Sequence, residues 1–282
     1  MHQHPVAVDA VKPPFAYFGG KTTIADRIVA LLPEHEHYVE PFAGSLAVLL
    51  AKPAARMETV NDIDHRLMTF WRVLRERPDD LIRACALTPH SRAEQQQAHV
   101  LDGCDDLEIA RRVWVWLSQS RTGTLKKTGW RHYVNADAGT IGMPGYLAGY
   151  VDRMAAIAER LHAVSLESRP ALDIVETYGA HPSALLYLDP PYLAETRNGR
   201  NYSHEMVGAD EHRELAAAAA DCAAAVVVSG YDSALYDALY DGWERHEISA
   251  MTTQGGTHGR RTEVLWSNRP LQTQCGLFEV VA

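Results

Sequence analysis

The tetrapeptide Asp189-Pro190-Pro191-Tyr192 directly follows the apolar run Ala184-Leu185-Leu186-Tyr187-Leu188. A short continuous apolar run predicts a buried β-strand. Two consecutive prolines cannot continue a strand ladder, so the strand should end at Asp189. Ligands of open α/β sheets bind at the carboxyl ends of the strands, which is where this arrangement puts a carboxylate and an aromatic ring. An ordinary Pro-Pro turn is the alternative that the tetrapeptide alone leaves open.

Length and composition are those of a soluble globular protein. The chain has 282 residues, of which 46% are hydrophobic and 22% charged, enough for one large domain or a domain with a smaller lobe. No apolar stretch approaches the roughly 20 residues of a membrane helix. Met1 to Pro14 contains no apolar signal core, so we expect a cytoplasmic protein with no membrane partner.

Cysteine and histidine spacing predicts no metal site. The four cysteines are far apart and form no CxxC pair, which favours free thiols and argues against zinc. His35 and His37 stand beside Glu34 and Glu36, but no third ligand is near them in the sequence. A solvated turn explains that spacing better than a metal does.

The distribution of charge is more informative than the total. A net charge of −9 argues against a protein whose whole surface binds nucleic acid. Arg111 to Tyr133, however, contains no acidic residue, and cations alternate there with aromatic residues. In the first part of this segment, Val113, Trp114, Trp116 and Leu117 share a helical stripe, which predicts core residues. Ser118 to Asn135 is polar and glycine-containing, which predicts a basic loop suited to phosphate contact and base stacking.

Strand and helix patterns alternate at both ends of the chain, which predicts an α/β fold with a mostly parallel sheet covered by helices. Strands are expected near 38–40, 59–62, 164–167, 184–188, 226–229, 244–249 and 263–267. Helices are expected near 22–33, 45–52, 64–74, 107–119, 170–178, 210–222 and 233–240, with another ending near His162. From about Pro78 to Leu161 the pattern is helices and one long loop, which indicates an inserted lobe.

Two further segments have the pattern of ligand-binding loops. Glu40 to Leu50 reads as strand, glycine turn and helix, and Asp62 ends the next strand, where a carboxylate can accept hydrogen bonds from a ribose diol. A structural turn followed by a helix-capping acid is equally open. Phe18-Gly19-Gly20-Lys21-Thr22 lacks the first glycine of a P-loop, because Phe15 stands there. The alternative is a glycine turn that presents Lys21 to an anionic group.

Together, these motifs resemble the Dam-type adenine-specific DNA methyltransferases. The resemblance rests on an ordered set: Phe18-Gly19-Gly20-Lys21, Glu40-Pro41-Phe42-Ala43-Gly44-Ser45, Asn61-Asp62-Ile63, Asp189-Pro190-Pro191-Tyr192, Ser229-Gly230-Tyr231, and Arg261-Thr262-Glu263-Val264-Leu265-Trp266-Ser267-Asn268. It covers Pro14 to Asn268. One departure is Leu46, which stands where the second glycine of the family's cofactor loop would be and leaves the local backbone geometry open.

The resemblance implies a Rossmann-like methyltransferase fold that uses S-adenosylmethionine. Residues 14–76 and 162–270 would form the catalytic domain, and 77–161 the inserted target-recognition lobe. Lys21 and the glycine turn would lie near the methionine end of the cofactor, Asp62 would hold the ribose, and Asp173 would contact the adenine. The implied cofactor-binding residues are Tyr17, Gly19, Gly20, Lys21, Glu40, Phe42, Gly44, Asp62, Asp173 and Asp189.

The implied partner is duplex DNA with the target adenine flipped out of the stack. Asp189 and the Pro190 carbonyl would accept the two N–H groups of the adenine amine, and Tyr192 would stack on the base. DNA contacts are expected from Arg121, Lys126, Lys127, Arg131, Tyr133, Arg197, Arg200, Tyr202, Arg260 and Arg261. A cognate restriction endonuclease is a possible further partner, and an orphan enzyme without one is equally compatible with the sequence.

Other functions remain open at this point. An amino-methyltransferase acting on RNA adenine or on cytosine N4 uses related motifs, although Asp189 favours adenine. A non-catalytic DNA-binding protein with a degenerate fold is a second alternative, against which the intact Asp189 and Asp62 argue. A P-loop nucleotide hydrolase is the third.

Overall fold

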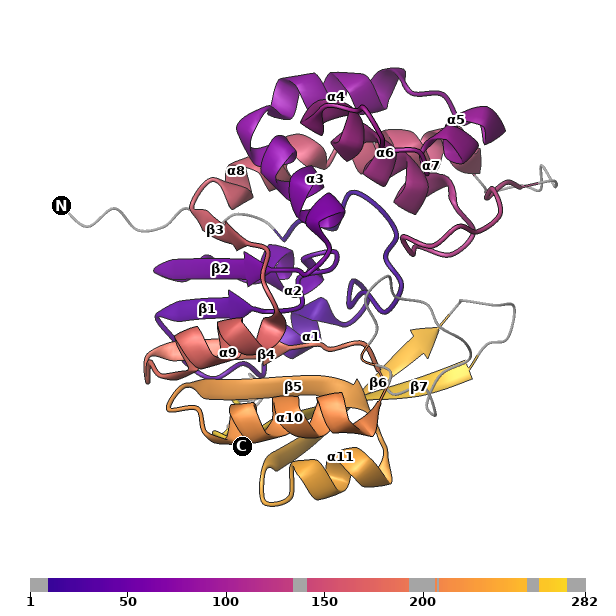
Figure 1. Ribbon diagram of the computed structural model, residues 1–282. Helices are drawn as coiled ribbons and strands as arrows, with labels where there is room; N and C mark the ends of the chain where they lie inside the picture. The colour runs from indigo at the N-terminus through magenta and orange to yellow at the C-terminus, as the bar shows by residue number, and fades with distance from the viewer. Residues whose placement is uncertain (1–9, 134–140, 193–205, 207, 253–258, 273–282) are drawn as a thin grey trace, which may run out of the picture.

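Seven strands form one sheet in the order β3-β2-β1-β4-β5-β7-β6 (Figure 1). The computed structural model describes residues 10–133, 141–192, 206, 208–252 and 259–272. The strands are β1 (His37–Glu40), β2 (Met57–Asn61), β3 (Val164–Glu167), β4 (Ala184–Leu188), β5 (Ala225–Tyr231), β6 (Glu244–Thr252) and β7 (Gly259–Ser267). β1 to β5 pair in parallel, and β7 lies antiparallel between β5 and β6. The predicted α/β fold with a mostly parallel sheet is confirmed.

Helices cover both faces of the sheet. They are α1 (Ala25–Val29), α2 (Ala47–Ala51), α3 (His65–Glu76), α4 (Pro78–Leu87), α5 (Arg92–Gln97), α6 (Asp106–Gln119), α7 (Gly142–Val151), α8 (Met154–Leu161), α9 (Ala171–Gly179), α10 (Ala209–Ala220) and α11 (Ala234–Leu239). No helix in these described ranges is long and apolar enough to cross a membrane. α1 is shorter than the sequence predicts because Ile24 N–H donates to Lys21 O at 2.9 Å, which makes a turn of residues 21–24.

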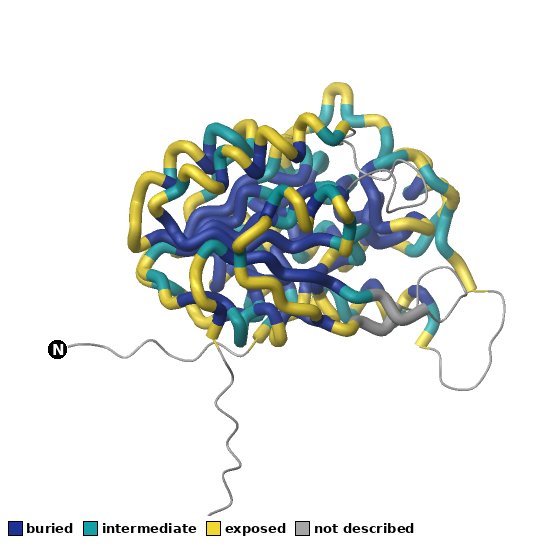
Figure 2. Tube along the Cα trace, turned by 90° about the horizontal axis from the view of Figure 1, so that it is seen from below, coloured by how far each residue is buried: buried dark blue, intermediate teal, exposed yellow. Residues whose placement is uncertain are grey.

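The alternation of side chains along the central strands explains why both faces are covered. In β4, Leu185 and Tyr187 join the core with α2 and α3, whereas Leu186 and Leu188 join the core with α9, α10 and α11. Successive strand residues point to opposite faces, so a strand that is apolar throughout must be buried on both. Figure 2 shows the result, a buried layer of strands between helices whose outer sides are exposed.

Helices α4 to α7 form a group stacked beyond α3 and α8 (Figure 1). Val113, Trp114 and Leu117 of α6 are fully buried there, as their helical spacing predicts. The boundaries of the inserted lobe, between residues 76 and 77 and between residues 161 and 162, stay a prediction.

The amino ends of the strands carry a buried ion cluster away from the candidate site. Glu58 of β2 accepts hydrogen bonds from Lys52 Nζ at 2.8 Å and from the guanidinium of Arg160, and all three side chains are at most 4% exposed. Burial raises the pKa of Glu58, but the hydrogen bonds from Arg160 and Lys52 outweigh it and keep that pKa below its usual value. The cluster therefore stabilises the fold above the unfolded-state pKa of Glu58 and loses this effect as the pH falls through the lower folded-state value.

We expect Glu58→Gln to destabilise the protein by about 3 to 5 kcal/mol, because it leaves two buried cations without their carboxylate. Urea unfolding at pH 7 measures this. The matched control is Glu36→Gln, which removes an exposed pair with Arg56 at 3.4 Å and should change stability by less than about 0.5 kcal/mol. Equal effects of the two variants would contradict a structural role for the cluster.

Candidate active site

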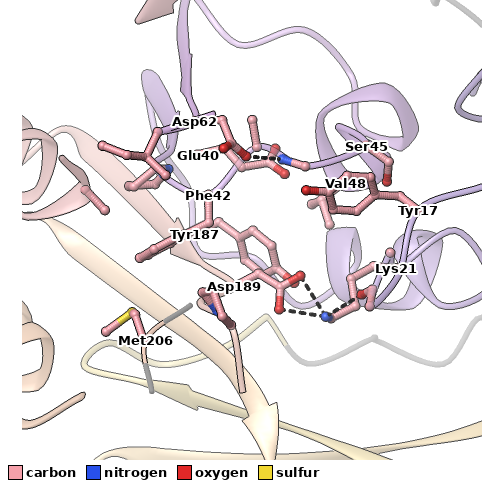
Figure 3. A pocket seen from close by; sticks show the side chains of 18 of the residues that line it. Tyr17, Lys21, Glu40, Phe42, Ser45, Val48, Asp62, Tyr187, Asp189 and Met206 are labelled. Atoms are coloured by element: carbon pink, nitrogen blue, oxygen red, sulfur yellow. Dashed lines mark hydrogen bonds and ion pairs between the residues drawn. The ribbon is translucent and has the colours of Figure 1, made fainter. Parts of the chain in front are cut away.

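A pocket of about 340 Å³ lies at the carboxyl ends of β1 and β4 (Figure 3). The chain runs from β1 outward to β2 and β3 on one side and returns with β4 on the other, so the two strands flank the point where strand order reverses. Its lining includes Tyr17, Gly19, Gly20, Lys21, Glu40, Phe42, Gly44, Asp62, Leu172, Asp189, Pro191 and Met206. Nine of the ten residues that the resemblance assigned to the cofactor thus line one cavity.

The loop after β1 is held in a tight turn by two residues with left-handed backbone. Gly44 has φ of 48°, and a Cβ there would lie 2.9 Å from Tyr17 Cε1. Leu46, which replaces the expected second glycine, itself adopts φ of 57° while its side chain is fully buried. A left-handed leucine costs roughly 1–2 kcal/mol, and burial of its side chain offsets that cost. Position 46 therefore keeps the left-handed backbone that a glycine would adopt, although a leucine stands there.

Asp62 fastens this loop to the sheet. Its Oδ2 accepts a hydrogen bond from Gly44 N–H at 3.0 Å, and its Oδ1 accepts one from Asp64 N–H at 2.9 Å. Asp64 in turn caps α3, because its side chain accepts a hydrogen bond from Arg66 N–H at 3.0 Å. Asp62 thus combines a structural contact with a place on the pocket wall, and its predicted contact with a ribose stays a prediction.

Glu40, the last residue of β1, is a buried carboxyl group in the same wall. It is 3% exposed and accepts a hydrogen bond from Tyr38 Oη at 3.0 Å. Burial raises its pKa to about 8, with a further contribution from the charge of Asp189. A cationic ligand beside Glu40 would favour the ionised form of this group.

Lys21 pairs directly with the candidate catalytic carboxylate. Its Nζ lies 2.6 and 2.7 Å from Asp189 Oδ1 and Oδ2, and 3.1 Å from Gly19 O (Figure 3). The anionic group to which the glycine turn presents Lys21 is therefore Asp189. Burial raises the pKa of Asp189 to about 6, and the charge of Lys21 opposes that shift.

Tyr192 is buried beneath this ion pair. It is 4% exposed, its hydroxyl accepts a hydrogen bond from Lys21 Nζ, and it donates one to Glu263 Oε1 at 2.6 Å. The ring centroid lies 4.3 Å from that of Tyr231. Pro190 is buried as well. The roles of the Pro190 carbonyl and of the Tyr192 ring toward a base stay predictions.

The basic loop is more ordered than its sequence indicates. Ser120 and Trp130 form an antiparallel bridge, so residues 120–130 make a closed hairpin-like turn, here called the basic hairpin. Gly123 O accepts a hydrogen bond from Phe18 N–H at 2.7 Å, which seats the hairpin against the segment that lines the pocket. Arg121 and Lys127 are exposed, and Lys126 is half-buried.

The base of the hairpin carries an aromatic stack that the sequence patterns did not reveal. Trp130 stacks between His90 and His132, with centroid distances of 4.4 and 5.0 Å, and the guanidinium of Arg92 lies 4.8 Å from its centroid. No local sequence signal links Trp130 to His90 or Arg92, because the contact depends on how α5 packs beside the hairpin. Arg131 is half-buried beside the exposed Tyr133, to whose hydroxyl it donates a hydrogen bond at 2.9 Å.

Other predicted site residues lie elsewhere. Asp173 is outside the pocket lining, and its carboxylate lies 3.5 Å from the guanidinium of Arg169. Arg260 and Arg261 belong to β7, opposite Met251 and Ala250 of β6. Three predicted DNA contacts fall outside the described residues: Arg197, Arg200 and Tyr202. Among the described residues, no group of three or more His, Cys, Asp or Glu side chains is arranged to hold a metal ion.

The sheet order and the pocket at its switch point, with a half-buried carboxylate after β4, are those of a Rossmann-like methyltransferase. The family described as D12 class N6 adenine-specific DNA methyltransferase matches residues 17–100 and 152–254. The chain belongs to this family, and its reaction is methylation of adenine in DNA. The two matched segments leave out the basic hairpin.

Curated relatives are similar over nearly their whole length. A protein named type II methyltransferase M1.LlaDCHI, from Lactococcus lactis subsp. cremoris, is 26% identical over 92% of this chain and 95% of its own. Proteins named DNA adenine methylase are 24% identical in Salmonella typhi, over 89% of this chain and 93% of theirs, and 23% identical in Vibrio cholerae, over 87% and 91%.

We expect Gly123→Ala to weaken both cofactor binding and methyl transfer. A Cβ at this position would lie less than 3.0 Å from Ala16 O, so the hairpin and the segment beside Tyr17 would have to separate, at a cost of about 1–3 kcal/mol. Calorimetric titration of S-adenosylmethionine measures the change. The control is Gly149→Ala in α7, where a Cβ meets nothing within 4 Å; an unchanged affinity in Gly123→Ala would contradict the coupling.

Proposed function

We propose that this protein transfers a methyl group from S-adenosylmethionine to the N6 amine of an adenine that is flipped out of duplex DNA at a specific sequence. The observation that carries the proposal is the position of Asp189. This carboxylate directly follows β4 and lines the pocket between β1 and β4. Neither the flipped base nor the specificity is needed to explain the fold. The flipped base follows from the chemistry of reaching an amine inside a duplex, and the specificity would come from contacts with base edges.

The pocket fits S-adenosylmethionine in size and in chemistry. Its volume of about 340 Å³ lies in the range of small-molecule sites. Phe42, Leu172 and Asp62 line the pocket, and Glu40 is a buried carboxyl group in its wall. Phe42 and Leu172 would contact the adenosine, Asp62 would accept hydrogen bonds from the ribose, and Glu40 would face the sulfonium or ammonium group. When bound, the cofactor supplies an electrophilic methyl group. The contribution of the chain is to orient it and exclude water.

Asp189 makes the amine nucleophilic by accepting its hydrogen bonds. The lone pair of an adenine amine is delocalised into the ring, so the amine reacts poorly in water. A carboxylate oxygen of Asp189 and the carbonyl of Pro190 would accept the two N–H groups and direct the lone pair toward the methyl group. This is catalysis by orientation and electrostatics, without a covalent enzyme intermediate.

DNA contact would be concentrated on the basic hairpin, because the chain as a whole carries a net charge of −9. Arg121, Lys126 and Lys127 would contact phosphates or base edges. Trp130, held by His90, His132 and Arg92, would give the hairpin a fixed base. Together with the rest of residues 77–161, the hairpin would form the target-recognition lobe.

The direct test is to express the protein in a host that lacks DNA methylation and to sequence the chromosome for modified bases. We expect N6-methyladenine within one short sequence motif. N4-methylcytosine, or methylation of RNA alone, would contradict the proposal. The same experiment shows whether the protein acts without a companion endonuclease.

We expect Asp189→Asn to abolish methyl transfer while cofactor binding persists, because the substitution preserves shape but removes the charged acceptor. Incorporation of labelled methyl groups into DNA and calorimetric titration of S-adenosylmethionine measure the two properties. Asp241→Asn, at an exposed carboxylate outside the pocket lining, is the matched control. The affinity of Asp173→Asn separately tests the predicted contact with the cofactor adenine. Turnover by Asp189→Asn at the wild-type rate would exclude the mechanism.

Replacement of Lys126 and Lys127 by alanine should weaken DNA binding and reduce the slope of log affinity against log salt by about 1 to 2, since each phosphate contact releases counterions. Fluorescence anisotropy over a series of salt concentrations measures the slope. The control is Arg56→Ala, an exposed arginine that precedes β2 at the opposite edge of the sheet. An unchanged slope in the double variant would show that these lysines do not contact phosphate.

A further inference from the structure

Glu263 of β7 is a buried carboxylate that the proposed mechanism does not use. Its side chain is 6% exposed. Its Oε1 accepts hydrogen bonds from Tyr192 Oη and from Ser229 Oγ, both at 2.6 Å, and lies 3.6 Å from Lys21 Nζ. Glu263 therefore contacts Tyr192 directly and lies close to Lys21, the two residues that link it to Asp189.

The charges of this cluster do not balance. One ammonium, that of Lys21, lies among two carboxylates, those of Asp189 and Glu263, at 2.6 and 3.6 Å. The side chains of Lys21 and Glu263 are almost out of contact with water, at 5% and 6% exposed, and that of Asp189 is 20% exposed. Electrostatic interactions between such groups are stronger than in bulk water. The position of Lys21 is therefore set by competition between two anions, with Tyr192 as a hydrogen-bond acceptor for Lys21 and a donor to Glu263.

The pairing seen here weakens Asp189 as a hydrogen-bond acceptor in its proposed role. Both of its oxygens lie within hydrogen-bond distance of Lys21 Nζ, yet one of them has to accept a hydrogen bond from the target amine. An ammonium bound to both oxygens draws electron density away from the acceptor. Each oxygen still has a second lone pair for the amine, but Asp189 becomes the stronger acceptor if Lys21 moves part of the way from it, and a buried ammonium needs another anion to move toward.

We propose that Glu263 is a positioning residue for methyl transfer: it holds Lys21 and Tyr192 away from Asp189 when the target amine binds, so that Asp189 remains a free anionic acceptor. The inference rests on the proposed role of Asp189. Lys21 would have to move only a short way to pair with Glu263, because its Nζ is already 3.6 Å from Glu263 Oε1. Glu263 itself is not among the residues that line the pocket.

A purely structural role for Glu263 makes different predictions. Ser229 and Tyr192 bond to the same oxygen and could simply tie β7 to β5 and to the segment after β4. In that case Ser229→Ala, which removes a neutral hydrogen bond and keeps the charge, should affect the protein in the same way as Glu263→Gln. A role in positioning Lys21 requires the charge.

The test uses single-turnover methylation of a duplex that carries the motif found by sequencing the expression host. We expect Glu263→Gln to lower the methyl-transfer rate constant at least about tenfold, with the Kd values for S-adenosylmethionine and for DNA unchanged. Glu263→Asp should restore most of the rate, because it returns the charge. Ser229→Ala should stay close to the wild type.

The pH profile separates positioning from stability. In the wild type, kcat/KM should rise as Asp189 ionises, with a midpoint near its pKa of about 6. The charge of Glu263 raises the pKa of Asp189, so Glu263→Gln should move this acidic limb to lower pH while the rate constant falls. A change confined to stability would leave the limb in place.

Several outcomes would overturn the inference. They are a wild-type rate in Glu263→Gln, an unmoved acidic limb, or an equal loss in Ser229→Ala. Should Glu263→Gln fail to fold, Tyr192→Phe tests the same point, because this variant lacks the hydroxyl between Lys21 and Glu263. We expect Tyr192→Phe to lower the methyl-transfer rate constant. A normal rate constant would reject the inference. Failure of the proposed function is distinguishable, since the wild type itself would then leave DNA adenine unmethylated.

Discussion

Parallel pairing of β1 with β4 is the interaction on which the site depends. Tyr38 is in register with Leu185, and Val39 with Leu186, so both strands end at the same edge of the sheet. Because the chain leaves β1 in one direction and returns as β4 from the other, no crossover helix covers this edge between them. The pocket forms in that gap, and Glu40 and Asp189 face into it from strands that are distant in sequence.

Two buried ion clusters lie at opposite ends of these strands and have opposite charge balance. Near the amino ends, Lys52 and Arg160 share the single carboxylate of Glu58. At the carboxyl ends, Lys21 is shared by two carboxylates. The first cluster holds elements together. The second carries an excess negative charge, which suits a site that receives a cationic cofactor and a group that donates hydrogen bonds.

The basic hairpin and the cofactor loop meet through one short segment. Gly123 packs against the backbone of Ala16 and Phe18, and the ring of Tyr17 packs against Gly44. If the hairpin shifted on contact with DNA, these contacts would displace the turn before α2 and the glycine turn that carries Lys21. This path consists of two close contacts at glycines, Gly123 against backbone and Gly44 against a tyrosine ring.

Local sequence determined where most strands and helices lie in the chain. It also determined that the candidate functional groups follow strands, at the carboxyl edge of the sheet. Apolar runs, prolines and glycines are short-range signals, and they correctly predicted β4, with Asp189 directly after it, and the turn at Gly44. Tertiary structure alone decided which side chains meet. Lys21 and Asp189 are 168 positions apart, and Tyr192 and Glu263 are 71 apart, so no local pattern encodes either contact. Likewise, the left-handed backbone of Leu46 is imposed by the burial of its side chain, not by its own preference. Contacts of this kind follow from strand order and packing, because only the folded sheet brings such distant positions together.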